Sequence, residues 1–303
     1  MHCPFGVIIL AGGQGSRLGF NYPKGCFELD EGDSLFKILI RKITSNNGWV
    51  AIMTSHETDA MTRDYLAGRN FFGLKERIGC FVQPSHPVTT RDGQLLYDGM
   101  GNLIQAPMGN GCVYQAFTQS PLYHQWDQLG IKIINVLPID NFLADPQDDE
   151  LISAVQQGVE LAVRGIQKSG EEKMGLIEVD QGRLKVIEYT EQQHAGLGYS
   201  GLFAMSWQFL QKASQLNLPL HPALKTMAVI DRGASQRVDI IKYEQFIFDA
   251  FTEASTFSVL DSCRKKYFCP LKDKLGPNGI EQVKEKFLEW KLHWSVSSGE
   301  GRV

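Results

Sequence analysis

The chain has 303 residues, 43% of them hydrophobic and 10% aromatic, which suffices for the core of a soluble globular protein and excludes disorder over most of the length. Its 30 Lys and Arg residues against 34 Asp and Glu residues give a net charge of −4, so no broad basic surface exists to hold duplex nucleic acid. No segment approaches the roughly 20 apolar residues of a membrane-spanning helix.

Short apolar runs alternate with amphipathic stretches through the first half of the chain. Residues 7–10 are too few for a signal peptide, lack its basic start and are followed at once by glycines, so we expect a strand. Residues 131–137 are apolar on both faces and stop at Pro138, which is typical of a buried strand. This alternation predicts an α/β fold with a largely parallel sheet. We expect further strands at 49–53 and 78–83, and helices at 34–43, 58–66 and 111–118.

The pattern changes in the second half of the chain. Residues 182–189 alternate polar and apolar, as a half-exposed antiparallel strand does, and we expect them to form a hairpin with residues 174–180. Such an insertion into a parallel sheet suits an element that covers a substrate. Residues 243–254 and 280–294 have apolar positions at helical spacing, and we predict two helices there.

The six cysteines are scattered and form no CxxC pair. A zinc site or a disulfide framework is therefore not expected, and a reducing cytoplasm is the default location. Neither nucleic acid nor a membrane is an expected partner. The sequence does not indicate an oligomeric state.

The most informative segment follows the first strand. It reads LAGGQGSRLG at residues 10–19, with PKG at 23–25. The glycines let the backbone turn sharply and approach a ligand, and exposed N–H groups in such a loop bind anions. Arg17 adds a donor fork suited to phosphate, and Lys24 adds a compact charge. The spacing is not a Walker A loop, and Leu18 stands where a Rossmann fingerprint has its third glycine, so GxG alone also fits a tight turn with an incidental arginine.

This loop resembles the signature of sugar-1-phosphate nucleotidylyltransferases, and more narrowly that of the eukaryotic-type UDP-sugar pyrophosphorylase family. That family has LAGGQGTRLG, then a tyrosine, then PKG. Among its members, the resemblance is strongest to those that act on N-acetylglucosamine 1-phosphate. It spans roughly residues 7–273 and continues in order at APMGNG (106–111), IDN (139–141), VIEYTE (186–191), KYEQFIFD (242–249) and FCPLK (268–272).

The resemblance implies a Rossmann-like nucleotidyltransferase fold of the GT-A-like kind, with an antiparallel hairpin over the sugar site. It implies a catalytic domain at residues 1–275 and a C-terminal helical extension at 276–303, with the family's N-terminal and C-terminal domains largely absent. The implied reaction joins UTP and a sugar 1-phosphate into a UDP-sugar and pyrophosphate. Both reactants are anionic, so catalysis consists mostly of alignment and charge neutralisation.

The resemblance assigns Arg17, Lys24 and Lys242 as catalytic cations. Asp140 follows the buried strand at 131–137, and ligands gather beyond the carboxyl ends of strands in open α/β sheets. A carboxylate there can hold Mg²⁺ together with substrate phosphates. As alternatives, Asp140 could cap a turn, and Lys242 could be a solvated lysine at the start of the helix expected at 243–254.

The resemblance also assigns substrate-binding positions. Leu197 and Ser200 stand where enzymes for acetylamino sugars carry asparagines, so glucose 1-phosphate remains an alternative to N-acetylglucosamine 1-phosphate. A non-catalytic nucleotide-sugar-binding protein is the alternative of another class, and retention of all the assigned cations argues against it. The implied positions are Leu10, Ala11, Gly12, Gly13, Gln83, Gly109 and Asn110 for the nucleotide, Gly175, Glu188, Tyr189 and Ser200 for the sugar, and Lys225 for phosphate.

Overall fold

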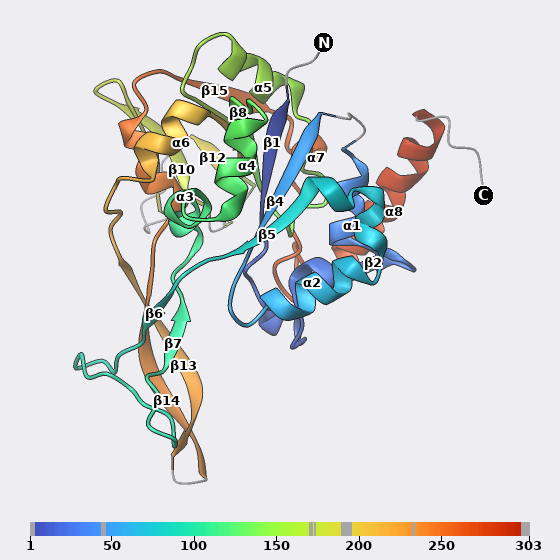
Figure 1. Cartoon of the computed structure of the whole chain (residues 1–303). Coiled ribbons are helices and arrows are strands. Elements are labelled where there is room, and N and C mark those ends of the chain that lie inside the picture. Colours follow the sequence, from blue (N-terminus) through green and yellow to red (C-terminus); the bar gives the residue numbers. More distant parts are fainter. Residues whose placement is uncertain are drawn as a thin grey trace.

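The computed structural model describes residues 4–43, 47–169, 172, 174–188, 196–231 and 234–297. Within them, a nine-stranded sheet forms the centre of the molecule, with helices on both faces (Figure 1). The main path of the sheet runs β11-β10-β12-β8-β1-β4-β5, while β9 pairs with β12 and β15 pairs with β9. These strands are β1 (Phe5–Leu10), β4 (Gly48–Thr54), β5 (Ile78–Val82), β8 (Ile133–Pro138), β9 (Leu161–Gln167), β10 (Leu176–Asp180), β11 (Arg183–Ile187), β12 (Leu197–Ser206) and β15 (Phe257–Ser262).

The direction of the strands places a common edge where a site can form. β1 runs parallel to β4 and β8, and β4 runs parallel to β5, so the carboxyl ends of these four strands lie at one edge. β12 is antiparallel to β8, and β10 and β11 form an antiparallel hairpin beside β12. The predicted α/β class, the mostly parallel sheet and the inserted hairpin are confirmed.

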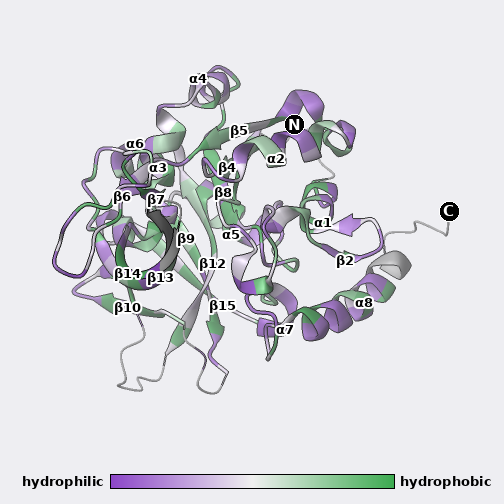
Figure 2. Ribbon diagram, turned by 90° about the horizontal axis from the view of Figure 1, so that it is seen from below, coloured by the Kyte–Doolittle hydropathy of each residue, from purple (hydrophilic) through white to green (hydrophobic). Residues whose placement is uncertain are grey.

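Two apolar clusters fill the space between the sheet and its helices. Val7 and Ile9 belong to one cluster with residues of α1, α5 and α8, whereas Ile8 belongs to the other with residues of α3, α4 and α6. Successive side chains of a strand point to opposite faces, so β1 contributes to both. Figure 2 shows hydrophobic colouring on the inner strands and mixed colouring along α8. The helices are α1 (Leu35–Arg41), α2 (Asp59–Ala67), α3 (Val113–Thr118), α4 (Pro121–Gln128), α5 (Asp149–Gln156), α6 (Trp207–Ala213), α7 (Arg264–Tyr267) and α8 (Ile280–Ser297).

Local signals located most of these elements correctly. Ser34 caps α1 as expected, because its Oγ accepts a hydrogen bond from Lys37 N at 3.1 Å. The helix expected near the C-terminus is α8, and it buries Val283 and Phe287 in the first cluster. The division of the chain at residue 275 stays a prediction. Among the described residues, no helix combines the length and the apolar character needed to cross a bilayer.

The helix expected at 243–254 is wrong. Strand β14 (Ala234–Glu244) continues to Glu244 and pairs with β13 (His221–Asp231), and only Ile247–Glu253 is helical, as a 3₁₀ helix. At Gln245 the N–H donates to Met108 O, and its carbonyl accepts from Gly111 N. These bonds to a distant loop replace the helical ones that the apolar spacing suggested.

The hairpin β13–β14 extends away from the central sheet (Figure 1). Strands β6 (Ser85–Pro87) and β7 (Gln105–Pro107) pair with each other, and Thr89 bridges to Ile241 of β14. We call residues 85–107 together with 221–231 and 234–244 the arm. A further short pair, β2 (Glu28–Asp30) with β3 (Asp33–Ser34), precedes α1. The root of the arm lies at the carboxyl edge of the central strands, and it can therefore contribute side chains to a site there.

Candidate active site

A cavity of about 720 Å³ lies beyond the carboxyl ends of β1, β4, β5 and β8, where ligands of open α/β sheets gather. Loops that follow these four strands form one side of it, and the root of the arm forms the other. The lining residues are Leu10, Gly12, Gly13, Gln14, Ser16, Arg17, Lys24, Met53, Ser55, Glu57, Gln83, Pro107, Gly109, Asn110, Pro138, Ile139, Asp140, Lys225, Lys242, Glu244 and Phe246.

The glycine loop presents its backbone to this cavity. Ala11 N donates to Met53 O at 2.8 Å, which keeps the loop aligned with β4 until the turn begins. A side chain at Gly12 would place its Cβ 1.9 Å from the amide nitrogen of Gln83, whereas Gly13 has no atom within 4 Å of that position. Lys24 N donates to Gly13 O at 3.3 Å and closes the loop. Only glycine at position 12 lets the backbone and Gln83 approach each other this closely.

Lys24 and Asp140 form a largely buried ion pair at the floor of the cavity. The Nζ atom of Lys24 lies 3.2 Å from Oδ2 of Asp140 and also donates to the carbonyl oxygen of Leu271 at 3.1 Å. The Lys24 and Asp140 side chains are 11% and 19% exposed. Gly25 packs directly against the Phe36 ring, which fixes the backbone next to Lys24. The ammonium group is therefore held by two acceptors while it lines the cavity.

Arg17 stands at the exposed rim. Leu18 beside it is buried and anchors the short 3₁₀ helix Ser16–Leu18. The Arg17 side chain is 72% exposed, and its guanidinium lies 4.0 Å from Asp273. A pair this exposed contributes little, so the guanidinium can turn to an anion in the cavity without a large penalty.

The arm brings a second set of charges. Lys242 and Glu244 lie two residues apart on β14, on one face of the strand, and both line the cavity. The Lys242 Nζ atom lies 2.7 Å from Oε1 of Glu244. Lys225 of β13 lines the same side. The structure thus brings Arg17, Lys24, Asp140 and Lys242 to one cavity.

Gln83 has a fixed orientation. Its side chain is buried, and its Oε1 accepts a hydrogen bond from Gly109 N at 3.1 Å. Because that partner is a donor, the amide NH₂ is the end that lies against Gly12. Asn110 Oδ1 accepts from Ile247 N at 3.0 Å, so the oxygen of Asn110 holds the start of the 3₁₀ helix. The free amide donors of Gln83 can therefore serve a carbonyl group in the cavity.

The sugar-side positions are not assembled in this cavity. Ser200 is buried, and its Oγ donates to the carbonyl oxygen of Arg164 at 2.8 Å, so the hydroxyl is engaged away from the site. Gly175 packs against Val186, and Glu188 is exposed beyond the end of β11. None of these three residues lines the cavity, and Ala11 is likewise buried beneath it. Tyr189 lies outside the described residues.

Several lining residues were missed by sequence reasoning. Glu57 could have been found from its place just after the strand at 49–53, but its residue type carries no distinct signal. Glu244 and Phe246 lie in the KYEQFIFD stretch, but the helix predicted at 243–254 gave no reason to place them in the cavity. Burial raises the pKa of Cys112, near Gln83, to about 12, so this thiol supplies no thiolate nucleophile at neutral pH.

The residues present are compatible with a magnesium ion that arrives with its substrate. Among the described residues, no group of three or more His, Cys, Asp or Glu side chains forms a metal cluster. Magnesium commonly uses one or two carboxylates and completes its shell with water and substrate phosphates. Asp140 is one such carboxylate, and the bond to Lys24 engages only one of its two oxygens.

Comparison with known proteins identifies relatives of this chain. Residues 5–197 match the model of the UTP–glucose-1-phosphate uridylyltransferase family. The chain is 34% identical to UDP-N-acetylglucosamine pyrophosphorylase of Saccharomyces cerevisiae, over 97% of this chain and 70% of that protein. It is 30% identical to UDP-N-acetylglucosamine diphosphorylase 1 of Arabidopsis thaliana, over 97% of this chain and 66% of that protein. The crystal structure of uridine diphosphate N-acetylglucosamine pyrophosphorylase from Trypanosoma brucei aligns with a TM-score of 0.82 at 25% identity, over 97% of this chain and 66% of that chain. The chain thus spans about two thirds of the length of these relatives.

Proposed function

The chain belongs to the UTP–glucose-1-phosphate uridylyltransferase family, the UDP-sugar pyrophosphorylases, and from this premise we propose that it joins UTP and a sugar 1-phosphate into a UDP-sugar and pyrophosphate. An oxygen of the sugar phosphate attacks the α-phosphorus of UTP, and the bond from that phosphorus to the β-phosphate oxygen breaks. No covalent intermediate on the protein is needed, because positioning and charge neutralisation carry most of the catalysis.

The convergence of cations on one cavity is the observation that carries this proposal. Arg17 and Lys24 approach from the glycine loop, and Lys225 and Lys242 approach from the arm. Two polyanions can therefore enter from two sides. We assign the triphosphate to the loop side, where Gly12 and Gly13 also line the cavity, and the sugar phosphate to the arm side.

We also propose that Asp140 holds Mg²⁺ together with phosphate oxygens of UTP. Bound there, the ion would supply charge neutralisation next to the α-phosphate. Lys24, 3.2 Å from the Asp140 carboxylate, contributes the second positive charge at the same place. One carboxylate oxygen of Asp140 and the carbonyl oxygen of Leu271 accept from Lys24 and keep its ammonium at this position before the substrate arrives.

Gln83 supports uracil as the base. Its amide oxygen is occupied by Gly109, so its NH₂ group offers donors to a carbonyl oxygen of uracil. Cytosine presents an amino group at the position of one uracil carbonyl, and two donors would then face each other. A buried donor left without an acceptor costs about 1–3 kcal/mol.

N-acetylglucosamine 1-phosphate is the leading sugar substrate, since the curated relatives at 30% and 34% identity are named for UDP-N-acetylglucosamine. Glucose 1-phosphate remains the second candidate, because Leu197 and Ser200 stand where enzymes for acetylamino sugars carry asparagines. A panel of both sugar phosphates and N-acetylgalactosamine 1-phosphate, each tested with UTP and Mg²⁺, distinguishes these substrates by the rate of pyrophosphate release.

The catalytic assignment is tested with Lys24→Met. We expect turnover to fall by about 10²–10³-fold, because a preorganised charge at the reacting phosphates is lost, while thermal unfolding shows a folded protein. Lys132→Met is the matched control, since Lys132 is exposed and lies outside this cavity. Absence of pyrophosphate release by the wild-type chain with every sugar phosphate of the panel would reject the proposed function.

A further inference from the structure

Leu271 touches both members of the Lys24–Asp140 pair, although it is far from them in sequence. Its carbonyl oxygen accepts a hydrogen bond from Lys24 Nζ at 3.1 Å. Its N–H donates to the carbonyl oxygen of Asp140 at 2.8 Å. The position of residues 267–271, which we call the clamp segment, therefore bears directly on the position of the ammonium group.

Asn141, the neighbour of Asp140, holds the clamp segment. Its side chain is fully buried, its Nδ2 donates to Tyr267 O at 2.7 Å, and its Oδ1 accepts from Cys269 N at 2.9 Å. Asn141 also forms an isolated bridge with Pro270. A side-chain amide supplies the donor and the acceptor that these two backbone groups require, which neither a carboxylate nor an apolar side chain can do.

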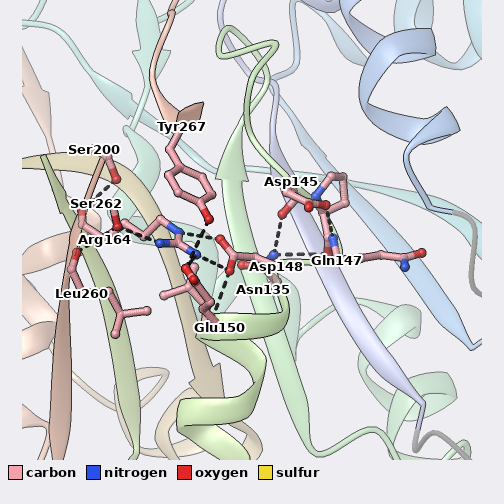
Figure 3. A network of polar contacts seen from close by, with 12 residues as sticks. Asn135, Asp145, Gln147, Asp148, Glu150, Arg164, Ser200, Leu260, Ser262 and Tyr267 are labelled. Carbon is pink, nitrogen blue, oxygen red and sulfur yellow. Dashed lines mark hydrogen bonds and ion pairs between the residues drawn. The ribbon is translucent and has the colours of Figure 1, made fainter. Parts of the chain in front are cut away.

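The start of the clamp segment is anchored a second time. The Tyr267 hydroxyl donates to Glu150 Oε2 at 3.2 Å, and the Arg164 guanidinium lies 3.7 Å from the centre of the Tyr267 ring. Arg164 is itself buried and bonded through two nitrogens to Asp148 (Figure 3). The segment is thus fixed by a buried ion pair at its first residue and by Asn141 along its length, and it presents Leu271 O at its far end.

We propose that Asn141 is a positioning residue for the reaction. Through the clamp segment it sets the position of Leu271 O, and through that acceptor the direction of the Lys24 ammonium. The inference rests on the proposed function, in which Lys24 acts on the reacting phosphates. Asn141 does not itself line the cavity.

The effect on rate follows from the chemistry of lysine. An ammonium on a four-carbon stem is a mobile point charge, and acceptors fix its direction. Without Leu271 O in place, Asp140 alone would hold the Lys24 ammonium group, and this group would lose its alignment toward the cavity. A displacement of about 1 Å at a reacting centre can cost on the order of 10²-fold in rate.

The test compares Asn141→Leu with Asn135→Leu. Asn135 is an equally buried asparagine, visible in Figure 3, whose Nδ2 donates to Asp145 O and Pro146 O at 3.0 and 3.1 Å. Asn141→Leu loses hydrogen bonds to three backbone groups, because Leu143 N also donates to Asn141 Oδ1 at 3.3 Å, and Asn135→Leu loses hydrogen bonds to two. Both variants should therefore lose thermal stability, and kcat is compared where both are folded. We expect Asn141→Leu to lower kcat by about 10- to 100-fold, with KM for the sugar phosphate within about twofold, and Asn135→Leu to keep kcat within about threefold.

A double-mutant cycle provides the readout that a merely structural role would not move. In the Lys24→Met background, Asn141→Leu should cause no further loss of kcat or of UTP affinity, because both changes act through the same ammonium. Equal loss of kcat in both asparagine variants, or an undiminished effect of Asn141→Leu in that background, would overturn the proposal. Should Asn141→Leu not fold, Asn141→Asp and Asn135→Asp take their places. Asn141→Asp keeps an acceptor for Cys269 N and replaces the donor to Tyr267 O by an oxygen, and both variants introduce the same buried charge.

Two failures remain distinguishable. A wild-type chain that forms no UDP-sugar rejects the proposed function. In that case calorimetric titration with UTP still tests the positioning role of Asn141. The role requires that Asn141→Leu weakens UTP binding when Lys24 is present and leaves it unchanged in the Lys24→Met background. A wild-type chain that turns over, with an Asn141→Leu variant as fast, rejects the positioning role alone.

Discussion

Replacing Gln83 by glutamate tests how the base is read. The substitution keeps an oxygen to accept from Gly109 N, which holds the side chain in its present direction at 3.1 Å. The NH₂ group that lies against Gly12 becomes a second oxygen. A uracil carbonyl would then face an acceptor instead of a donor, while the amino group of cytosine would gain a partner. We therefore expect kcat/KM for UTP to fall and that for CTP to rise relative to it.

The magnitude follows from the burial of Gln83, which is 5% exposed. A buried polar group that loses its partner costs about 1–3 kcal/mol, which corresponds to about 5- to 150-fold in kcat/KM for UTP. The gain for CTP has the same physical origin and the opposite sign. The ratio of the two nucleotides should therefore change by at least about tenfold.

The assay is pyrophosphate release under steady-state conditions, with UTP and CTP each at saturating sugar 1-phosphate. Gln119→Glu is the control, because Gln119 is an exposed glutamine outside the cavity and gains the same charge. A Gln83→Glu protein with unchanged thermal stability and an unchanged ratio of kcat/KM values for CTP and UTP would refute the assignment of Gln83 to the base.

Three further predictions concern the loop, the buried ion pair and a buried lysine. Gly12→Ala places a methyl group 1.9 Å from the glutamine amide nitrogen, so we expect KM for UTP to rise at least about tenfold, and an unchanged KM would show that the contact is irrelevant. Asp148→Asn keeps the cap of α5 but leaves Arg164 without its buried counter-charge, so it should lower the free energy of unfolding by about 3–5 kcal/mol. Glu150→Gln, at a side chain 62% exposed, should lower it by less than about 1 kcal/mol. Equal losses for the two variants in urea unfolding would contradict this account. Burial lowers the pKa of Lys42 from its ordinary value of 10.5 to about 7. Between these pH values the unfolded chain binds more protons than the folded chain, so the stability of the wild type relative to Lys42→Met should rise with pH, by up to about 1.4 kcal/mol per pH unit. A stability difference between the two proteins that stays constant from pH 7 to 10 would contradict this prediction.

The parts of the fold that depend on neighbouring residues could be predicted from the sequence. The first strand and its glycine loop lie within fifteen residues of each other, and the Ser34 cap bonds to a residue three positions on. Apolar runs located β4, β5 and β8 because a buried strand needs no distant partner to be recognised by composition. The carboxyl edge of these strands then indicated where Asp140 would lie, and the family resemblance assigned Lys24 to the same reaction.

The parts of the fold and of the site that depend on contacts between distant residues could not be predicted from the sequence. Periodicity at 243–254 favoured a helix, but the bonds of Gln245 to Met108 and Gly111 decided the backbone there. The resemblance assigns Ser200 to the sugar, and the hydrogen bond that its hydroxyl donates to the Arg164 carbonyl could not be predicted from the sequence. Asn141 meets its two partners in the clamp segment 126 and 128 positions away, so no local pattern could assign it a role toward Lys24.

The most direct test of the account follows the phosphorus atoms of UTP by ³¹P NMR while the chain is incubated with UTP, Mg²⁺ and N-acetylglucosamine 1-phosphate or glucose 1-phosphate. The account predicts that the signals of a UDP-sugar and of pyrophosphate grow together in equal amounts with at least one of the two sugars, and that Lys24→Met slows both signals alike. Unchanged UTP with both sugars, or conversion of UTP to UDP and inorganic phosphate, would contradict it.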